Sequence, residues 1–148
     1  MKDVLDFINN EYTLVIQGTL SSVSGIAQHH LGAQIAIYSD ARSGGTPASY
    51  ASLATFTDGT LILSGAFADL IRNTFTPTLG SFAGQVNFSG GTRLADLATP
   101  NGWPCGGGWS RSISGIPAGF QENWDGKIDL PPVAVEPQSW GAVKRLYE

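Results

Sequence analysis

The residue types that could bind a metal ion are few and poorly spaced in this chain. His29 and His30 are adjacent, so on a strand their side chains would point to opposite faces, and both could bind one ion only from a loop. The sequence holds no third histidine and a single cysteine, Cys105. We therefore predict no metal site and interpret the histidine pair as part of a solvated loop.

Side chains that could act as nucleophiles also lack the partners that catalysis requires. No Gly-x-Ser-x-Gly segment marks a serine as activated. Cys105 lies between glycines and tryptophans that could leave its thiol exposed, but only the two distant histidines could serve as its base. Gly106-Gly107-Gly108 lacks the spacing and the lysine of a phosphate-binding loop. We predict no enzyme activity, no cofactor and a structural or incidental thiol.

Pairs of carboxylates offer little more. Asp125 and Asp129 fall on the same side of a predicted strand with Lys127 between them, a spacing that favours a solvated stripe over the paired acids of a glycosidase. Asp40 and Asp58 could contribute to a calcium site, but no dense Asp/Asn/Gly loop of that type occurs in the sequence.

The tryptophans are the most suggestive side chains. Exposed indoles stack on sugar rings, whereas buried ones fill a core. Trp103 and Trp109 lie in a glycine-rich stretch where they could form a binding platform, and an indole that plugs the open end of a β-sandwich is the alternative. Periodicity assigns Trp124 and Trp140 to the core.

Composition limits the partners of the chain. Its 148 residues suit one domain, and the net charge of −4 with scattered arginines excludes a nucleic-acid surface. No apolar run approaches the roughly 20 residues of a membrane span. Residues 1–8 lack the apolar stretch of a signal peptide, but an exported protein whose leader has been removed would read the same. Both compartments therefore stay open.

The elements that must position these residues are mainly strands. The chain has 19 glycines and few Lys and Glu, a composition typical of strands joined by turns. Alternation predicts strands over 11–20, 33–38, 82–88 and 123–130, the last near a sheet edge. The most distinctive turn is Asp58-Gly59, which predicts a hairpin between 50–57 and 60–67.

The remaining segments predict a short helical turn at 94–97, a long irregular loop over 100–109 and two terminal helices. Asp3 could cap a helix over 4–8, and Ser139 could cap a helix over 139–147. We predict a mainly β fold, an antiparallel β-sandwich or jelly roll with a short helix at each end. Residues 1–130 would form the domain, and 131–148 a Pro-rich extended arm and terminal helix that pack on the domain or on a neighbour.

Several segments resemble small exported bacterial β-domain proteins of uncharacterised function. The resemblance covers about half of the chain and rests on residues 56–65, 84–92 and 124–128, together with a Trp-Gly-x-x-Lys-x-Leu-Tyr tail at 140–147. It implies an extracellular or envelope setting and no catalytic residues.

These observations favour a non-enzymatic, secreted or surface β-domain with a structural, self-assembling or adhesive role, such as a subunit of an extracellular filament or particle. Its partner would be itself or another envelope protein, with Trp140, Val143, Leu146 and Tyr147 as the assembly surface. One alternative is a carbohydrate-binding module that uses Trp103 and Trp109 on a polysaccharide. A second alternative is a viral or phage structural protein.

Overall fold

The computed structural model describes residues 5–112, 114 and 116–131. These residues form strands and two 3-10 helices in the order β1 (Asn10–Gln17), β2 (Ser22–Ser24), β3 (Ala27–Leu31), β4 (Gln34–Ala41), η1 (Leu53–Phe56), β5 (Thr60–Thr76), β6 (Leu79–Gly90), η2 (Leu94–Asp96), β7 (Trp103–Ser110) and β8 (Asn123–Ile128). The mainly β prediction is confirmed.

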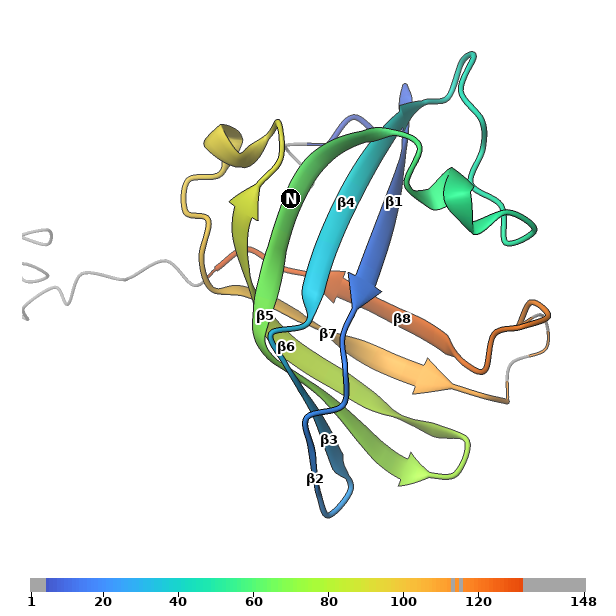
Figure 1. Ribbon diagram of the computed structural model, residues 1–148, viewed down its shortest axis with the longest axis vertical. Coiled ribbons are helices and arrows are strands. Elements are labelled where there is room, and N and C mark those ends of the chain that lie inside the picture. The colour runs from blue at the N-terminus through green and yellow to red at the C-terminus, as the bar shows by residue number, and fades with distance from the viewer. Residues whose placement is uncertain (1–4, 113, 115, 132–148) are drawn as a thin grey trace, which may run out of the picture.

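All the strands belong to one antiparallel sheet, in the order β1-β4-β5-β6-β7-β8, with β3 pairing with both β5 and β2 (Figure 1). The long strand β5 pairs with β4 through its first half and with β3 through its second half. Gly32 lies in the turn that joins β3 to β4, and Gly18 directly follows β1. A Cβ on Gly18 would lie 2.8 Å from that of Ala33, and Gly32 has a φ of +66°, which only glycine adopts readily.

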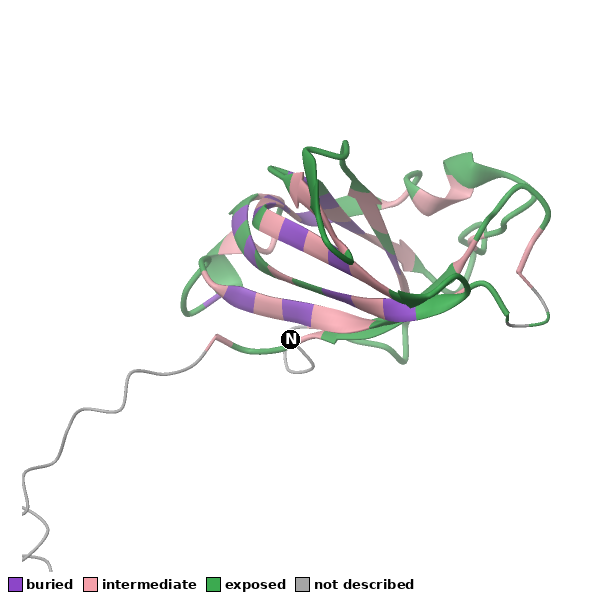
Figure 2. Cartoon of the chain, turned by 90° about the horizontal axis from the view of Figure 1, so that it is seen from below, coloured by how far each residue is buried: buried purple, intermediate pink, exposed green. Residues whose placement is uncertain are grey.

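Register shifts along β5 help the sheet to curl, so that one face becomes concave. Because successive side chains alternate, each strand contributes every second residue to this face, as the banded burial in Figure 2 shows. The core lies on it and contains Ala33, Ile35, Ile37, Leu63, Phe67, Leu70, Phe82, Val86, Phe88, Trp103 and Cys105.

Strand glycines make room for the aromatic rings of this core. A Cβ on Gly126 would lie 2.6 Å from the Phe82 ring, one on Gly84 would lie 2.8 Å from the Phe67 ring, and one on Gly80 would touch Trp109. Some of the glycines, which had predicted turns, therefore lie inside strands, where neighbouring aromatic rings cover the backbone.

The two outer strands of the sheet, β1 and β8, each pair on one side only within the described residues. The curl brings β8 across the end of β1 without the two strands pairing (Figure 1). The described residues thus form one open, curled sheet, and the two separate sheets of a β-sandwich or jelly roll are not observed among them.

Four strand predictions, over 11–20, 33–38, 82–88 and 123–130, are confirmed within a few residues by β1, β4, β6 and β8, the last at an edge. The prediction of a hairpin at Asp58-Gly59 is wrong. Residues 53–56 form η1, which covers the convex side of β1 through a 2.6 Å hydrogen bond from Thr13 Oγ1 to the Phe56 carbonyl. Strand β5 pairs with β4 and β6 instead.

The loop predicted over 100–109 is also wrong, because residues 103–110 form strand β7 between β6 and β8. The helical turn at 94–97 is confirmed by η2. Residues 5–9 form a turn and no helix, while Asp3 and Val4 of the predicted first helix lie outside the described residues. The second terminal helix, with Trp140, Val143, Leu146 and Tyr147, also lies outside them.

In the described part of the chain, no helix has the length and apolar character needed to cross a membrane.

Candidate functional site

Trp103 and Trp109 do not form the exposed platform predicted from the sequence. Their exposed fractions are 2% and 3%, and each indole N–H donates a 2.8 Å hydrogen bond to a backbone carbonyl, that of Thr99 for Trp103 and that of Asn73 for Trp109. Both side chains point inward from β7 and cover the core. Neither face of this pair is free to stack on a sugar.

The exposed indole belongs instead to Trp124, which periodicity had assigned to the core. Trp124 lies on the edge strand β8, is 36% exposed and packs on the Phe82 ring at a centroid distance of 4.6 Å. Its N–H donates a 2.7 Å hydrogen bond to Glu122 Oε1, which fixes the plane of the ring. Three neighbouring hollows share this side chain.

The first hollow, which we call the edge groove, is an apolar space of about 670 Å³ between β1 and β8. Tyr12, Leu14 and Ile16 line it from β1, Phe82 and Cys105 form its floor, and its remaining lining includes Leu5, Phe7, Ile37, Trp124 and Ile128. Leu14 is 45% exposed although it points to the concave face. Among the described residues, the groove therefore leaves core-like surface uncovered between two strand edges that pair with no other strand.

Cys105 lies on the floor of this groove and is 8% exposed. Burial raises the pKa of its thiol, which disfavours the reactive thiolate. Its surroundings are those of a small apolar core residue.

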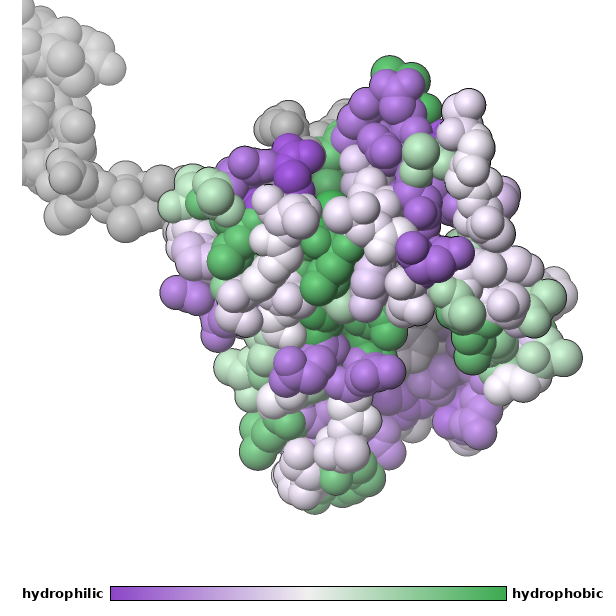
Figure 3. Space-filling view, turned by 45° about the horizontal axis from the view of Figure 1, so that its top comes forward, coloured by the Kyte–Doolittle hydropathy of each residue, from purple (hydrophilic) through white to green (hydrophobic). Residues whose placement is uncertain are grey.

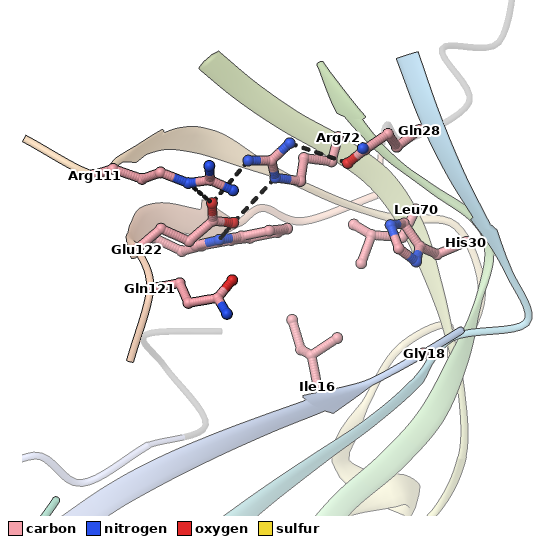
Figure 4. A pocket seen from close by; sticks show the side chains of 10 residues that line it. Ile16, Gly18, Gln28, His30, Leu70, Arg72, Arg111, Gln121 and Glu122 are labelled. Carbon is pink, nitrogen blue, oxygen red and sulfur yellow. Dashed lines mark hydrogen bonds and ion pairs between the residues drawn. The ribbon is translucent and has the colours of Figure 1, made fainter. Parts of the chain in front are cut away.

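The second hollow, which we call the arginine pocket, has a volume of about 380 Å³ and lies beyond the C-terminal end of β1 (Figure 4). Arg72, on the concave face of β5, forms its wall together with Glu122. The Arg72 guanidinium donates to Glu122 from Nε (3.0 Å) and Nη2 (2.7 Å), and from Nη1 to Gln28 and Thr74. It also stacks on the buried Trp109 ring. Each nitrogen of this buried guanidinium thus has a hydrogen-bond acceptor, and its face packs on an aromatic ring.

Glu122 links this buried arginine to a second one. Its Oε2 also accepts a 3.1 Å hydrogen bond from Nε of Arg111, whose side chain is 46% exposed. Burial alone raises the pKa of Glu122, but hydrogen bonds from Arg72, Trp124 and Arg111 outweigh it, so the pKa lies below its ordinary value of 4.5. One ionised carboxylate therefore faces two guanidinium groups.

Around this frame, four polar side chains face the same space, namely Gln28, His30, Gln121 and Arg111, with Ile16 and Leu70 completing the wall (Figure 4). Within the described residues, the side chains of His30 and Gln121 form no hydrogen bond. The amide nitrogen of Gln28 and the terminal nitrogens of Arg111 also form none there.

The third hollow, about 440 Å³, lies on the other side of Trp124 beside Tyr50 and Phe120, whose rings meet edge to face at 5.1 Å. These aromatic side chains are 58% and 38% exposed. Figure 3 shows hydrophobic residues (green) at the surface among hydrophilic ones (purple).

The histidine pair lies on strand β3 and not in a loop. The two side chains point to opposite faces, as adjacent residues on a strand must. His30 enters the arginine pocket, whereas His29 Nδ1 lies 2.7 Å from Asp69 Oδ2. In the described residues, no three His, Cys, Asp or Glu side chains are grouped as a metal site would require.

The acidic residues singled out from the sequence lie apart from these hollows. Lys127 pairs with Asp129 at 2.9 Å on the exposed side of β8. Asp40 has a pKa raised by desolvation and then by nearby Asp58.

The arginine pocket escaped sequence reasoning because its residues come from five separate segments. One signal for this pocket was present in the sequence. Arg72 follows Leu70 at the inward spacing of β5, and a charge at a core position requires a buried partner.

Comparisons with protein-family models, with curated proteins and with solved structures find no match to this chain.

Proposed function

We propose that this chain is a non-enzymatic subunit that assembles with further copies by strand addition at the edge groove. In this proposal, residues 133–137 of one copy lie between β1 and β8 of the next. The setting would be extracellular or on a cell surface, as in a filament or sheath, and a viral or phage particle would use the same contact.

The observation that carries the proposal is the open apolar seam of the sheet. Among the described residues, strands β1 and β8 end the sheet, and the space between them is lined mainly by apolar side chains, with Thr13 and Lys127 as the polar members of the lining. Unpaired strand edges recruit other strands, and exposed apolar surface favours a covering partner. An incoming strand could pair with the outer edge of β1 and bury Leu14, as donor strands do in other assemblies.

The arm that follows β8 has the sequence of such a strand. Pro131-Pro132 precedes Val133-Ala134-Val135, in which the two valines would point to one face and Ala134 to the other. Val133 and Val135 would enter the groove, where β-branched side chains pack well. Their apolar character matches that of the lining.

A neighbouring copy is the favoured acceptor because of the two prolines. Each proline fixes its own φ and holds the preceding residue in an extended conformation. The tight reversal that would lay the arm beside its own β8 is therefore disfavoured. In the proposal, the arm therefore enters the groove of a neighbouring copy.

Sedimentation velocity of the full chain over a range of concentrations tests the proposal. We expect concentration-dependent oligomers. Val135→Asp places a charge in the apolar groove and should weaken association at least a hundredfold, the equivalent of about 2.8 kcal/mol. Ala134→Asp is the matched control, because the neighbouring side chain faces away from the groove, and it should leave association nearly unchanged.

The acceptor side is tested by Leu14→Glu, since Leu14 is 45% exposed and a charge there should not unfold the single copy. Leu79→Glu, at a leucine of 46% exposure on β6, is its control. A strictly monomeric full chain at every concentration would overturn the proposal. Equal effects of each variant and its control would also overturn it.

A further inference from the structure

We propose that the arginine pocket binds a sugar ring that carries a carboxylate, such as a uronic-acid residue of an acidic polysaccharide. This proposal goes beyond assembly, because the pocket is complete within one copy of the chain. The case rests on which groups of the pocket are already paired, on its charge and on the neighbouring indole.

The frame of the pocket is fully occupied by internal bonds. Glu122 accepts four hydrogen bonds, two from Arg72 and one each from Arg111 and Trp124, at 2.7–3.1 Å. Arg72 is 7% exposed and has three acceptor residues. These two side chains therefore hold the shape of the pocket, and a ligand would not displace them at low cost.

The groups that face the open space are different, because their hydrogen-bonding capacity is largely unused. The ring nitrogens of His30 and the amide nitrogen of Gln28, both on β3, and the amide of Gln121, which precedes β8, converge on the pocket (Figure 4). Planar amides and imidazoles are suited to the hydroxyl groups of a sugar, which both donate and accept. Ile16 and Leu70 offer an apolar wall beside them.

The charge of the pocket favours an anion. Two guanidinium groups share one carboxylate, which leaves a surplus positive charge on Arg111. This side chain uses Nε for Glu122 and keeps its terminal nitrogens for another acceptor, while being 46% exposed. A carboxylate is the acceptor that a guanidinium fork matches best. One surplus charge suits a single carboxylate and is too little for a polyphosphate.

Trp124 supplies the remaining feature of a sugar site. One side of its ring packs on Phe82, its N–H is fixed by Glu122, and 36% of the residue stays exposed. The C–H face of a pyranose packs on such a preoriented indole. A volume of about 380 Å³ lies within the range of small-molecule sites.

The test is an NMR titration of the full chain carrying ¹⁵N-labelled tryptophan. Trigalacturonate is the probe, galactotriose its neutral counterpart and sodium acetate the bare carboxylate. We expect trigalacturonate to shift the Trp124 indole signal, assigned with Trp124→Phe, with a Kd below about 1 mM. Galactotriose and acetate should each bind at least tenfold more weakly, because galactotriose lacks the carboxylate and acetate lacks the sugar ring.

Arg111→Ala should weaken trigalacturonate binding at least tenfold, and Gln121→Ala, at an exposed position that should not affect folding, severalfold. Arg93→Ala is the matched control, since Arg93 is similarly exposed and also pairs with one carboxylate, that of Asp96. It should leave the affinity unchanged. Equal binding of the neutral sugar or of acetate, no effect of Arg111→Ala, or no binding of trigalacturonate would each overturn the proposal.

Discussion

The guanidinium carbon of Arg72 lies 3.6 Å from the centre of the Trp109 ring, inside the concave face of the sheet. Both side chains are buried, and the indole N–H of Trp109 is bonded to the Asn73 carbonyl, so the ring stays in place beneath the cation. Glu122 approaches the same guanidinium in its plane. The stacked pair thus closes one end of the concave face and supports the arginine pocket above it.

Removal of the cation should destabilise the fold. Arg72→Met takes away the stacking on Trp109 and leaves Glu122, with a 16% exposed side chain, without its main partner. We expect the free energy of unfolding to fall by about 3 kcal/mol, as for other broken buried pairs, measured by urea denaturation.

Arg93→Met provides the comparison for this prediction, because the Arg93–Asp96 pair is nearly half exposed and should contribute less than about 1 kcal/mol. A loss at Arg72 no greater than that at Arg93 would show that the buried cluster does not stabilise the sheet.

Acid should weaken the fold partly through Glu122. The pKa of this carboxyl is below 4.5 in the folded chain, so its stabilising contribution is complete above 4.5 and is lost as the pH falls through the folded value. Asp40 acts in the opposite direction, because its raised pKa favours the folded state in acid. Urea midpoints at about pH 6 and about pH 3 measure the net change.

In Glu122→Gln, the part of the acid sensitivity that belongs to Glu122 should disappear. The variant is less stable than the parent at about pH 6, and the gap between them narrows at about pH 3. A gap that stays constant or widens in acid would contradict this assignment.

The glycine beneath the Phe82 ring should not tolerate a side chain. In Gly126→Ala, the new Cβ would meet Phe82 at 2.6 Å and the Gly106 carbonyl at 2.5 Å. We expect a loss of about 1–3 kcal/mol in unfolding free energy, because the ring must move.

Gly108→Ala tests the same substitution on the neighbouring strand, where the nearest atom to a new Cβ is the Gly80 carbonyl oxygen at 3.6 Å. It should be neutral or stabilise by up to about 1 kcal/mol through the unfolded chain. Similar losses for both alanines would mean that strand propensity, and not the Phe82 contact, decides the cost.

The strands of this fold were predictable where side chains alternate between one buried and one exposed face. Strands β1, β4, β6 and β8 follow that pattern. Strand β7 does not, because one proline and three glycines replace its alternating residues, and only pairing on both sides with β6 and β8 makes Trp103–Ser110 extended. The turn-forming pair Asp58-Gly59 predicted the wrong partner for β5, because the strand that pairs with its first half lies further away in the sequence.

The candidate site was less predictable than the fold. The tryptophans could be singled out from the sequence, but whether an indole is buried depends on which strand lies next to it. Trp109 lies on β7 under Arg72, whereas Trp124 lies on the outermost strand. The meeting of Arg72 with Glu122, fifty residues apart, follows from the curl of the sheet.

Hydrogen–deuterium exchange of the edge strands tests the proposed assembly most directly. In the full chain at high concentration, peptides covering residues 10–17 should exchange slowly, because an inserted arm bonds to the outer edge of β1. Dilution or Val135→Asp should restore fast exchange, and Ala134→Asp should not. Fast exchange at every concentration, or protection that Val135→Asp leaves intact, would contradict strand addition at the edge groove.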